Sequence, residues 1–221
     1  MQFSILSGLI NDYSVVFYRV GRTSNVLLYE DRSVGDWGLF TNGLPEATIQ
    51  SKGNPRQWIP MARSLPLFGV LGTPDAKSMM VVGLGGGLAV ESVPGSIKKI
   101  EVVELEPEVV AANRVVAEER LKDPLSDPRV RIRLEDARSA LRLSEEKFDI
   151  VVSQPSHPFT SGSSHLYTKE FFELVQSRLR PQGSFVQWMG GSLVDEKLFL
   201  SLLASLGSVF ENVEVYLPKN G

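Results

Sequence analysis

The sequence predicts an α/β fold, in which a small antiparallel β domain precedes a doubly wound, mainly parallel sheet with helices on both faces. Residues 1–75 contain short strand-like runs separated by turn signals. From Lys77 onward, apolar strand-like runs instead alternate with amphipathic helical stretches. We therefore divide the chain into an N-terminal β-hairpin domain at 1–75 and an α/β domain at 76–221.

The elements of the N-terminal domain are predicted mainly from its turns. Strands are expected at 15–20, 25–30 and 38–41. Asn42 and Gly43 then give a strong hairpin signal, because both residue types tolerate positive φ. A helix is expected at 58–68, limited by two prolines, and the composition of 72–75 is typical of a linker.

The α/β domain is predicted from a change of period. Strands are expected at 79–82, 100–103, 130–134, 148–152, 184–188 and 213–217, and helices at 107–121, 168–179 and 195–210. Within 129–134, arginines alternate with apolar residues. This alternation favours an edge strand with one solvated face over an anion site.

The last predicted strand, 213–217, ends four residues before the last residue given. Sheets of this type generally finish with a seventh, antiparallel strand, without which the sixth exposes unpaired backbone donors. We expect either that the sequence stops before that strand or that a partner chain supplies the pairing.

Composition restricts the functional classes. A net charge of −3 argues against a nucleic-acid binder that depends on a broad basic surface. No apolar run approaches the roughly 18 residues of a membrane span, and the first residues lack a basic leader typical of a signal peptide. The chain has no cysteine and two histidines, which excludes thiolate chemistry and argues against a metal site. We expect a cytoplasmic protein.

The most informative motif is the glycine turn at 83–87, followed 21 residues after Gly83 by Glu104. Glycines let a backbone turn sharply and approach a ligand closely. A carboxylate about 20 residues further on suits the two hydroxyls of a ribose. The motif favours an adenosine-containing ligand over a turn that only serves packing. Polar segments at 104–106, 135–137 and 153–157 also follow predicted strands, at the edge where such sheets bind ligands.

Several segments together resemble the spermidine/spermine synthase (polyamine aminopropyltransferase) family, and are most similar to its divergent bacterial branch, whose members often carry membrane helices upstream. The segments occur in family order at 39–46, 64–67, 83–87, 103–106, 127–130, 135–138 and 166–172. The resemblance implies a Rossmann-like sheet of the methyltransferase type. It also implies a homodimer assembled through the N-terminal β region.

The resemblance assigns roles to particular residues. Glu104 would hold the ribose hydroxyls, and Asp136 with the Ala137 backbone would lie by the adenine. The turn residues Gly83, Gly85, Gly86 and Gly87 would line the sulfonium and its side chain. The family uses decarboxylated S-adenosylmethionine as co-substrate and no tightly bound cofactor. An amine attacks the methylene beside sulfur and releases methylthioadenosine.

The chain departs from the family at the amine end of the site. Gln154 and His157 stand where active members carry two aspartates. Glutamine accepts a hydrogen bond from an amine but is no base, whereas His157 either replaces the base or only caps its loop. Gly86 replaces an aspartate that favours the decarboxylated donor. At the substrate end, Trp58 and the residue after it replace the family's Tyr-Gln pair. Glu46 is then the better candidate for holding an ammonium group.

Three functions remain open on these residues. The first is aminopropyl transfer to a polyamine amine. The second is methyl transfer from S-adenosylmethionine itself, since the segment from Gln154 to Ser156 occupies the place of amide-proline motifs in some methyltransferases. The third is a catalytically silent domain that keeps the nucleoside pocket.

Overall fold

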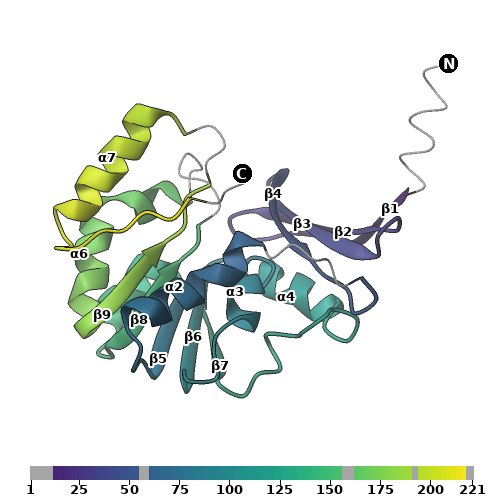
Figure 1. Ribbon diagram of the computed structural model, residues 1–221. Coiled ribbons are helices and arrows are strands. Elements are labelled where there is room, and N and C mark those ends of the chain that lie inside the picture. The colour runs from purple at the N-terminus through teal and green to yellow at the C-terminus, as the bar shows by residue number, and fades with distance from the viewer. Residues whose placement is uncertain (1–11, 55–59, 156–161, 191–193, 218–221) are drawn as a thin grey trace.

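The structure is a computed structural model that describes residues 12–54, 60–155, 162–190 and 194–217. A four-stranded antiparallel sheet precedes a five-stranded parallel sheet with helices on both faces (Figure 1). The predicted fold class is therefore confirmed.

The N-terminal sheet is a meander of consecutive hairpins. Its strands are β1 (Tyr13–Val20), β2 (Asn25–Asp31), β3 (Asp36–Thr41) and β4 (Leu44–Ile49), paired in that order. The predicted turn between β3 and β4 is confirmed, with φ of 50° at Asn42 and 78° at Gly43. The sequence analysis did not predict β4, which opens with Leu-Pro-Glu and alternates only weakly.

The first strand of the parallel sheet is its central one, and later strands are added on both sides of it. Its strands are β5 (Ser78–Val82), β6 (Lys99–Glu104), β7 (Val130–Leu134), β8 (Phe148–Ser153) and β9 (Leu179–Gln187), in the order β7-β6-β5-β8-β9. β7 lies at an edge, as its arginine alternation predicts. Successive strands are added on one side of β5 up to β7 and then, from β8, on its other side. Sheets of this kind bind ligands at such a switch point, beyond the carboxyl ends of the strands.

Helices cover both faces of the parallel sheet and bury two apolar layers. One layer includes side chains of α2 (Leu65–Gly72), α3 (Leu88–Glu91) and α4 (Pro107–Val115), together with residues of the N-terminal sheet. The other includes α5 (Ala137–Leu143) and α6 (Lys169–Arg178), with residues at the end of α7 (Glu196–Gly207) packed against it. Two short 3-10 helices, η1 (Met61–Ser64) and η2 (Ser164–Tyr167), precede α2 and α6.

The sequence analysis was wrong about the strand at 213–217. These residues are exposed, and no strand pairing reaches them in the described part of the chain. Tyr216 instead stacks on Phe68 of α2, with ring centroids 4.3 Å apart. A segment needs a neighbouring strand to pair with before it becomes a strand itself. That a seventh strand or a partner chain supplies this pairing stays a prediction.

Two helix boundaries also differ from the expected ones. α4 ends at Val115 and turns follow it. Backbone hydrogen bonds then join Glu119 and Leu121 to Lys52 and Gln50, which follow β4. The helix expected at 58–68 is η1 followed by α2, which begins at Leu65 with Pro66 in its first turn, a position that tolerates proline.

Candidate functional site

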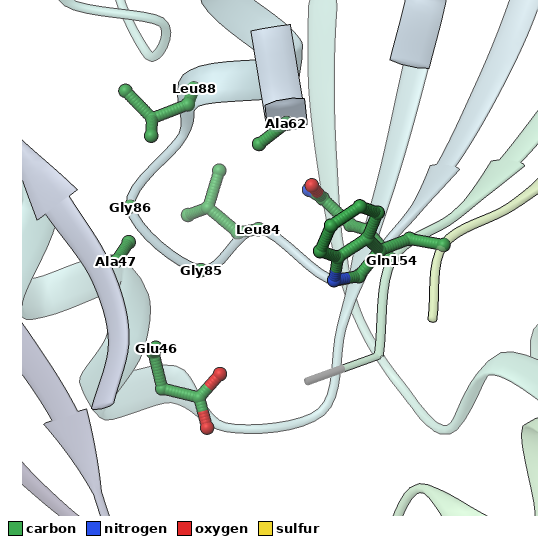
Figure 2. A pocket seen from close by; sticks show the side chains of 9 residues that line it. Glu46, Ala47, Ala62, Leu84, Gly85, Gly86, Leu88 and Gln154 are labelled. Carbon is green, nitrogen blue, oxygen red and sulfur yellow. The ribbon is translucent and has the colours of Figure 1, made fainter. Parts of the chain in front are cut away.

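Two adjoining cavities lie at the carboxyl ends of the central strands, at the switch point. The larger has a volume of about 430 Å³ and the smaller about 80 Å³. Three of the described residues line both cavities: Glu46 of β4, Gly85 and Gln154. Figure 2 shows Glu46 on the strand that also carries Ala47, with its carboxylate directed into the open space beside the glycine turn. The N-terminal sheet therefore contributes a carboxylate to a site built mainly on the parallel sheet.

The glycine turn is the wall shared by the two cavities. Gly83, Gly85 and Gly87 have φ of 87°, 51° and 78°, a region that side chains with a Cβ rarely adopt. Gly83 and Gly85 line the larger cavity, and Gly86 lines the smaller. Gly87 lines neither and begins α3, where a Cβ would lie 2.6 Å from Pro124.

Gly86 is excluded from carrying a side chain by the strand opposite. A Cβ placed there would lie 2.6 Å from the Cβ of Ala47 on β4 and 3.1 Å from Ile49. An aspartate at this position would require β4 to move. The carboxylate that β4 contributes here is that of Glu46, which directly precedes Ala47.

Glu104 ends β6 and is buried at the wall of the larger cavity. Its carboxylate accepts hydrogen bonds from the backbone N–H of Leu84, at 2.8 Å, and of Glu106, at 2.9 Å. Burial raises the pKa of Glu104, an effect that these hydrogen bonds oppose and the charge of Glu46 reinforces. Each carboxylate oxygen has a second lone pair for a ligand hydroxyl.

Asp136 and Ala137 lie at the start of α5 and also line the larger cavity. Asp136 caps the helix, accepting a hydrogen bond from the backbone N–H of Ser139 at 2.9 Å. The cap fixes the orientation of the carboxylate at the cavity wall.

Gln154 follows β8 directly across from the glycine turn. Its backbone N–H donates to the carbonyl of Val82 at 3.1 Å, and its Nε2 donates to the carbonyl of Gly83 at 2.8 Å. With the amide nitrogen engaged in this way, its Oε1 is the atom that can accept from a ligand. His157 and Trp58, the other two predicted residues of the amine end, lie outside the described residues.

The smaller cavity combines an apolar wall with one carboxylate among its described lining residues. Ala62, Leu84 and Leu88 supply aliphatic surface, and Trp188 supplies an aromatic side chain. The hydroxyl of Thr41 donates a hydrogen bond to Glu46. The cavity is therefore suited to a short aliphatic chain that ends in a cation.

Trp188 was predicted only as the last residue of a strand, and not as a site residue. Its backbone N–H donates to the carbonyl of Ser153 at 2.8 Å, and its carbonyl accepts from the hydroxyl of Tyr167 at 3.1 Å. Its position at the carboxyl end of a strand beside the switch point is the signal that identifies it as a site candidate.

The sequence analysis also missed the contribution of the β1–β2 turn. Thr23 and Ser24 line the larger cavity, and both donate hydrogen bonds to the carboxylate of Glu106. The sequence of the β1–β2 turn does not indicate this contact, because Glu106 lies more than 80 positions further along the chain.

The described ranges contain no group of three or more side chains of the metal-ligating types placed to hold an ion. None of their helices combines the length and the apolar composition needed to cross a membrane.

Comparison with known proteins gives consistent matches. A family model described as "Spermine/spermidine synthase domain" matches residues 64–218. Thermospermine synthase ACAULIS5 of Arabidopsis thaliana is 29% identical over 65% of this chain and 44% of its own length. Polyamine aminopropyltransferase 2 of Pseudomonas aeruginosa is 30% identical over 64% of this chain and 42% of its own. The matched segment thus spans less than half the length of these relatives.

Solved structures match over a longer part of the chain. A crystal structure of spermidine synthase in complex with the transition-state analogue AdoDATO superimposes with a TM-score of 0.77, covering 90% of this chain and 66% of that one. Spermidine synthase from Thermotoga maritima gives a TM-score of 0.74, with 90% and 65% covered. Both are 19% identical to this chain, so the similarity establishes the fold.

Proposed function

Because the chain belongs to the spermine/spermidine synthase family, we propose that it transfers an aminopropyl group from decarboxylated S-adenosylmethionine to an amine of the polyamine class. The observation that carries the proposal is the junction of the two cavities at Gly85, Glu46 and Gln154. A nucleoside in the larger cavity would place its sulfonium at this junction, with the group to be transferred directed toward the smaller cavity.

The larger cavity is suited to the nucleoside. Its volume of about 430 Å³ lies within the roughly 300–1,000 Å³ of typical ligand pockets. Glu104 would accept hydrogen bonds from the ribose hydroxyls, and Asp136 would accept from the exocyclic amine of adenine beside the Ala137 backbone. Gly83 and Gly85 allow the ligand to approach the backbone closely.

The smaller cavity is suited to an ammonium group. Glu46 would pair with the cation of the aminopropyl chain or of the acceptor, and the aliphatic wall would pack against the methylenes. A carboxylate at this place also disfavours a donor that carries its own carboxylate. Glu46 thus compensates for the absence of a side chain at Gly86.

The chemistry is a single displacement. The lone pair of a neutral amine forms a bond to the methylene carbon, and the carbon–sulfur bond breaks. Its electron pair neutralises the sulfonium, which leaves as methylthioadenosine, and the new ammonium loses a proton. Gln154 Oε1 would orient the amine by accepting an N–H hydrogen bond, since an amide is no base. We assign the proton to His157, whose ordinary pKa lies near 6.5.

Methyl transfer from S-adenosylmethionine is the second candidate, favoured by Gly86 and by an amide in the place of the family's aspartate. A silent nucleoside-binding domain is the third, consistent with Glu104 and Asp136 being present without the usual acid–base pair. The carboxylate of Glu46 at the cavity junction argues against a carboxylate-bearing donor and so favours aminopropyl transfer.

We also propose that the protein forms a homodimer through its N-terminal sheet. β1 is an edge strand, and its exposed apolar side chains, Tyr13, Val15, Tyr18 and Val20, form an uncovered apolar face. Light scattering on the eluting protein would measure its mass. A mass of one chain at micromolar concentration would contradict the dimer.

Product analysis by mass spectrometry tests the function. The purified protein is incubated with decarboxylated S-adenosylmethionine, with and without a mixture of di- and polyamines. We expect methylthioadenosine only when amine is present. S-adenosylhomocysteine from S-adenosylmethionine would identify a methyltransferase, and nucleoside binding without either product would identify a silent domain.

A further inference from the structure

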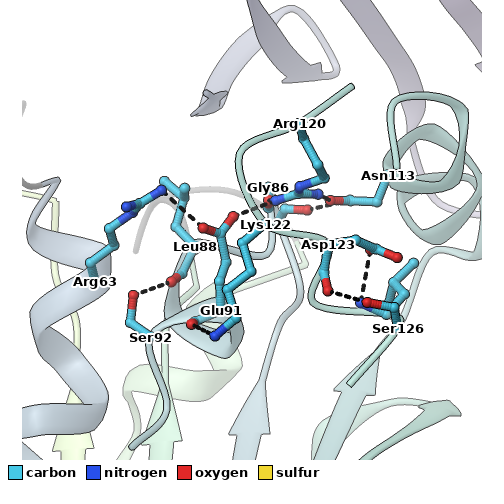
Figure 3. A network of polar contacts seen from close by, with 12 residues as sticks. Arg63, Gly86, Leu88, Glu91, Ser92, Asn113, Arg120, Lys122, Asp123 and Ser126 are labelled. Carbon is cyan, nitrogen blue, oxygen red and sulfur yellow. Dashed lines mark hydrogen bonds and ion pairs between the residues drawn. The ribbon is translucent and has the colours of Figure 1, made fainter. Parts of the chain in front are cut away.

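Arg120 is completely buried and directs its guanidinium at the back of the glycine turn (Figure 3). Its Nη2 donates to the carbonyl of Gly86 at 2.6 Å, and its Nη1 donates to Oδ1 of Asn113 at 2.7 Å. The Nδ2 of Asn113 in turn donates to the carbonyl of Gly85 at 2.8 Å. The side of the turn away from the cavities is therefore held by two side chains that the sequence analysis did not identify.

Glu91 is the acidic partner of this arginine and of a second one. Its Oε1 accepts from Arg120 Nη2 at 2.6 Å, and its Oε2 accepts from Arg63 Nη2 at 2.9 Å. Lys122 donates to the Glu91 backbone carbonyl. A buried guanidinium needs a counter-charge, because its desolvation is otherwise uncompensated. Glu91 therefore joins Arg63 and Arg120 through the two oxygens of one carboxylate (Figure 3).

The two arginines hold different elements that line the smaller cavity. Arg63 lies in η1, next to Ala62, which lines that cavity. Arg120 contacts Gly86, which lines it from the glycine turn, and Glu91 itself is the last residue of α3, whose first residue, Leu88, lines it too. Figure 2 shows Ala62, Leu84 and Leu88 on the same side of the cavity, beside the turn.

We propose that Glu91 is a positioning residue, which through Arg63 and Arg120 sets the spacing between η1 and the glycine turn and thereby the shape of the smaller cavity. The group that enters this cavity is then selected in part by an ion-pair bridge outside it. This inference rests on the proposed function for the identity of that group, an aliphatic ammonium, but the mechanical link between the two walls does not depend on it.

Arg63→Gln tests the bridge with little risk to the fold, because it removes the η1 arm and leaves the buried pair of Glu91 and Arg120 intact. Arg129→Gln is the matched control. The side chains of Arg63 and Arg129 are 20% and 22% exposed, and each pairs with a carboxylate. Neither arginine lines a cavity itself, but Arg63 follows Ala62, which does, whereas the hydrogen-bond partners of Arg129 line neither cavity. The Nη1 of Arg129 instead donates hydrogen bonds to the backbone carbonyls of Pro94 and Ile97, at 2.8 Å each.

Three readouts are compared between the variants. Hydrogen exchange by mass spectrometry reports the peptides that contain residues 61–72 and 83–92. Steady-state kinetics reports KM for the amine, and titration reports the Kd of methylthioadenosine. We expect Arg63→Gln to exchange faster in both peptides and to raise the amine KM by about tenfold, with the Kd of methylthioadenosine changed less than about twofold.

Faster exchange at 61–72 alone, or equal effects of Arg129→Gln, would overturn the bridge. An unchanged amine KM despite faster exchange in both peptides would overturn the selective role. If the wild-type protein shows no turnover with any amine, the proposed function fails, and the exchange of the 83–92 peptide still decides whether Arg63 acts on the glycine turn.

Discussion

The carboxylate of Glu106 accepts two hydrogen bonds from Thr23, one from the backbone N–H at 2.9 Å and one from the hydroxyl at 3.1 Å. The backbone N–H groups of Arg22 and Ser24 also donate to it. A Cβ at Gly21 would lie 2.2 Å from its Oε1, so a side chain there would displace the carboxylate from its present position. One side chain at the start of α4 thus fixes the β1–β2 turn against the larger cavity.

Loss of this contact should destabilise the protein in a pH-dependent way. Burial alone would raise the pKa of Glu106, but the hydrogen bonds from Thr23, Arg22 and Glu108 outweigh it and hold the pKa below its ordinary value. The unfolded chain therefore binds the proton more readily. The stabilisation is complete above the ordinary pKa, about 4.3, and is lost as pH falls through the lower folded pKa.

Glu106→Gln should accordingly lower the free energy of unfolding by about 1–3 kcal/mol at pH 7. Urea denaturation at pH 7 and at pH 3.5 measures the difference from the wild type, which should shrink at the acid pH. Glu145→Gln, at an exposed position, is the control and should change neither value appreciably. A constant difference at both pH values would mean that the charge of Glu106 does not contribute.

Glu104→Gln should weaken nucleoside binding. The variant loses the negative charge and one acceptor oxygen, so the Kd of methylthioadenosine should rise about tenfold or more, as expected for a hydrogen bond to a charged group. Because burial raises the pKa of Glu104, wild-type affinity should also fall on acidification at a higher pH than for an ordinary glutamate. Isothermal titration across pH measures both effects.

Glu101→Gln is the matched control for this experiment. Glu101 is buried in the same strand and pairs with Arg133 at 3.7 Å, but it lines neither cavity. It should leave the Kd unchanged even if stability falls. Equal losses of affinity in both variants would remove Glu104 from the ribose site.

The elements that the sequence predicted correctly are those whose signals are local. Continuous apolar runs identified the inner strands, and Asn42 with Gly43 identified a turn that needs positive φ at both residues. The strand expected at 213–217 shows the opposite case. Its residue types favour a strand, but pairing depends on a neighbour that its own residues cannot specify.

The same distinction applies to the site. Glu104 and Gln154 were proposed from the sequence because both follow predicted strands, and Glu104 also has the expected spacing from the glycine turn. Arg120 was not, since its guanidinium reaches Gly86 across 34 positions and nothing nearby marks it as buried. The bulk of Ala47 opposite Gly86 is likewise a tertiary fact, which changes how the absence of an aspartate there is interpreted.

Gly86→Ala should destabilise the protein, because its new methyl group would overlap the Cβ of Ala47 on β4. We expect a loss of about 1–3 kcal/mol, typical of overpacking. Gly95→Ala is the control, since nothing lies within 4 Å of a Cβ built at Gly95. Ala47→Gly should restore stability to Gly86→Ala in a double variant. A fully stable Gly86→Ala would show that β4 yields easily and that an acidic side chain fits there.

Glu46→Gln should reduce selection for the decarboxylated donor. The variant keeps the shape of the side chain but cannot pair with an ammonium or repel a carboxylate. The KM for decarboxylated S-adenosylmethionine or for the amine should rise about tenfold or more. Competition by S-adenosylmethionine should strengthen, as measured by its inhibition constant. If neither the KM values nor that constant changes, Glu46 has no part in binding the cation.

Gln154→Leu should slow the chemical step by removing both functions of the amide. The Oε1 acceptor for the amine is lost, and so is the Nε2 donor to the carbonyl of Gly83. We expect kcat to fall about 10- to 100-fold, the cost of losing one orienting hydrogen bond in the transition state. Gln154→Asn, which keeps the amide on a shorter side chain, should retain more of the rate.

His157→Ala separates proton removal from this orienting role. Loss of a general base lowers kcat by about 10²–10⁴-fold, and the acid limb that this base gives to the pH–rate profile should disappear with it. Gln154→Leu should keep that limb, because an amide does not titrate. Should His157→Ala instead retain both its rate and the limb, another group removes the proton, and Gln154 then orients an amine that already arrives neutral.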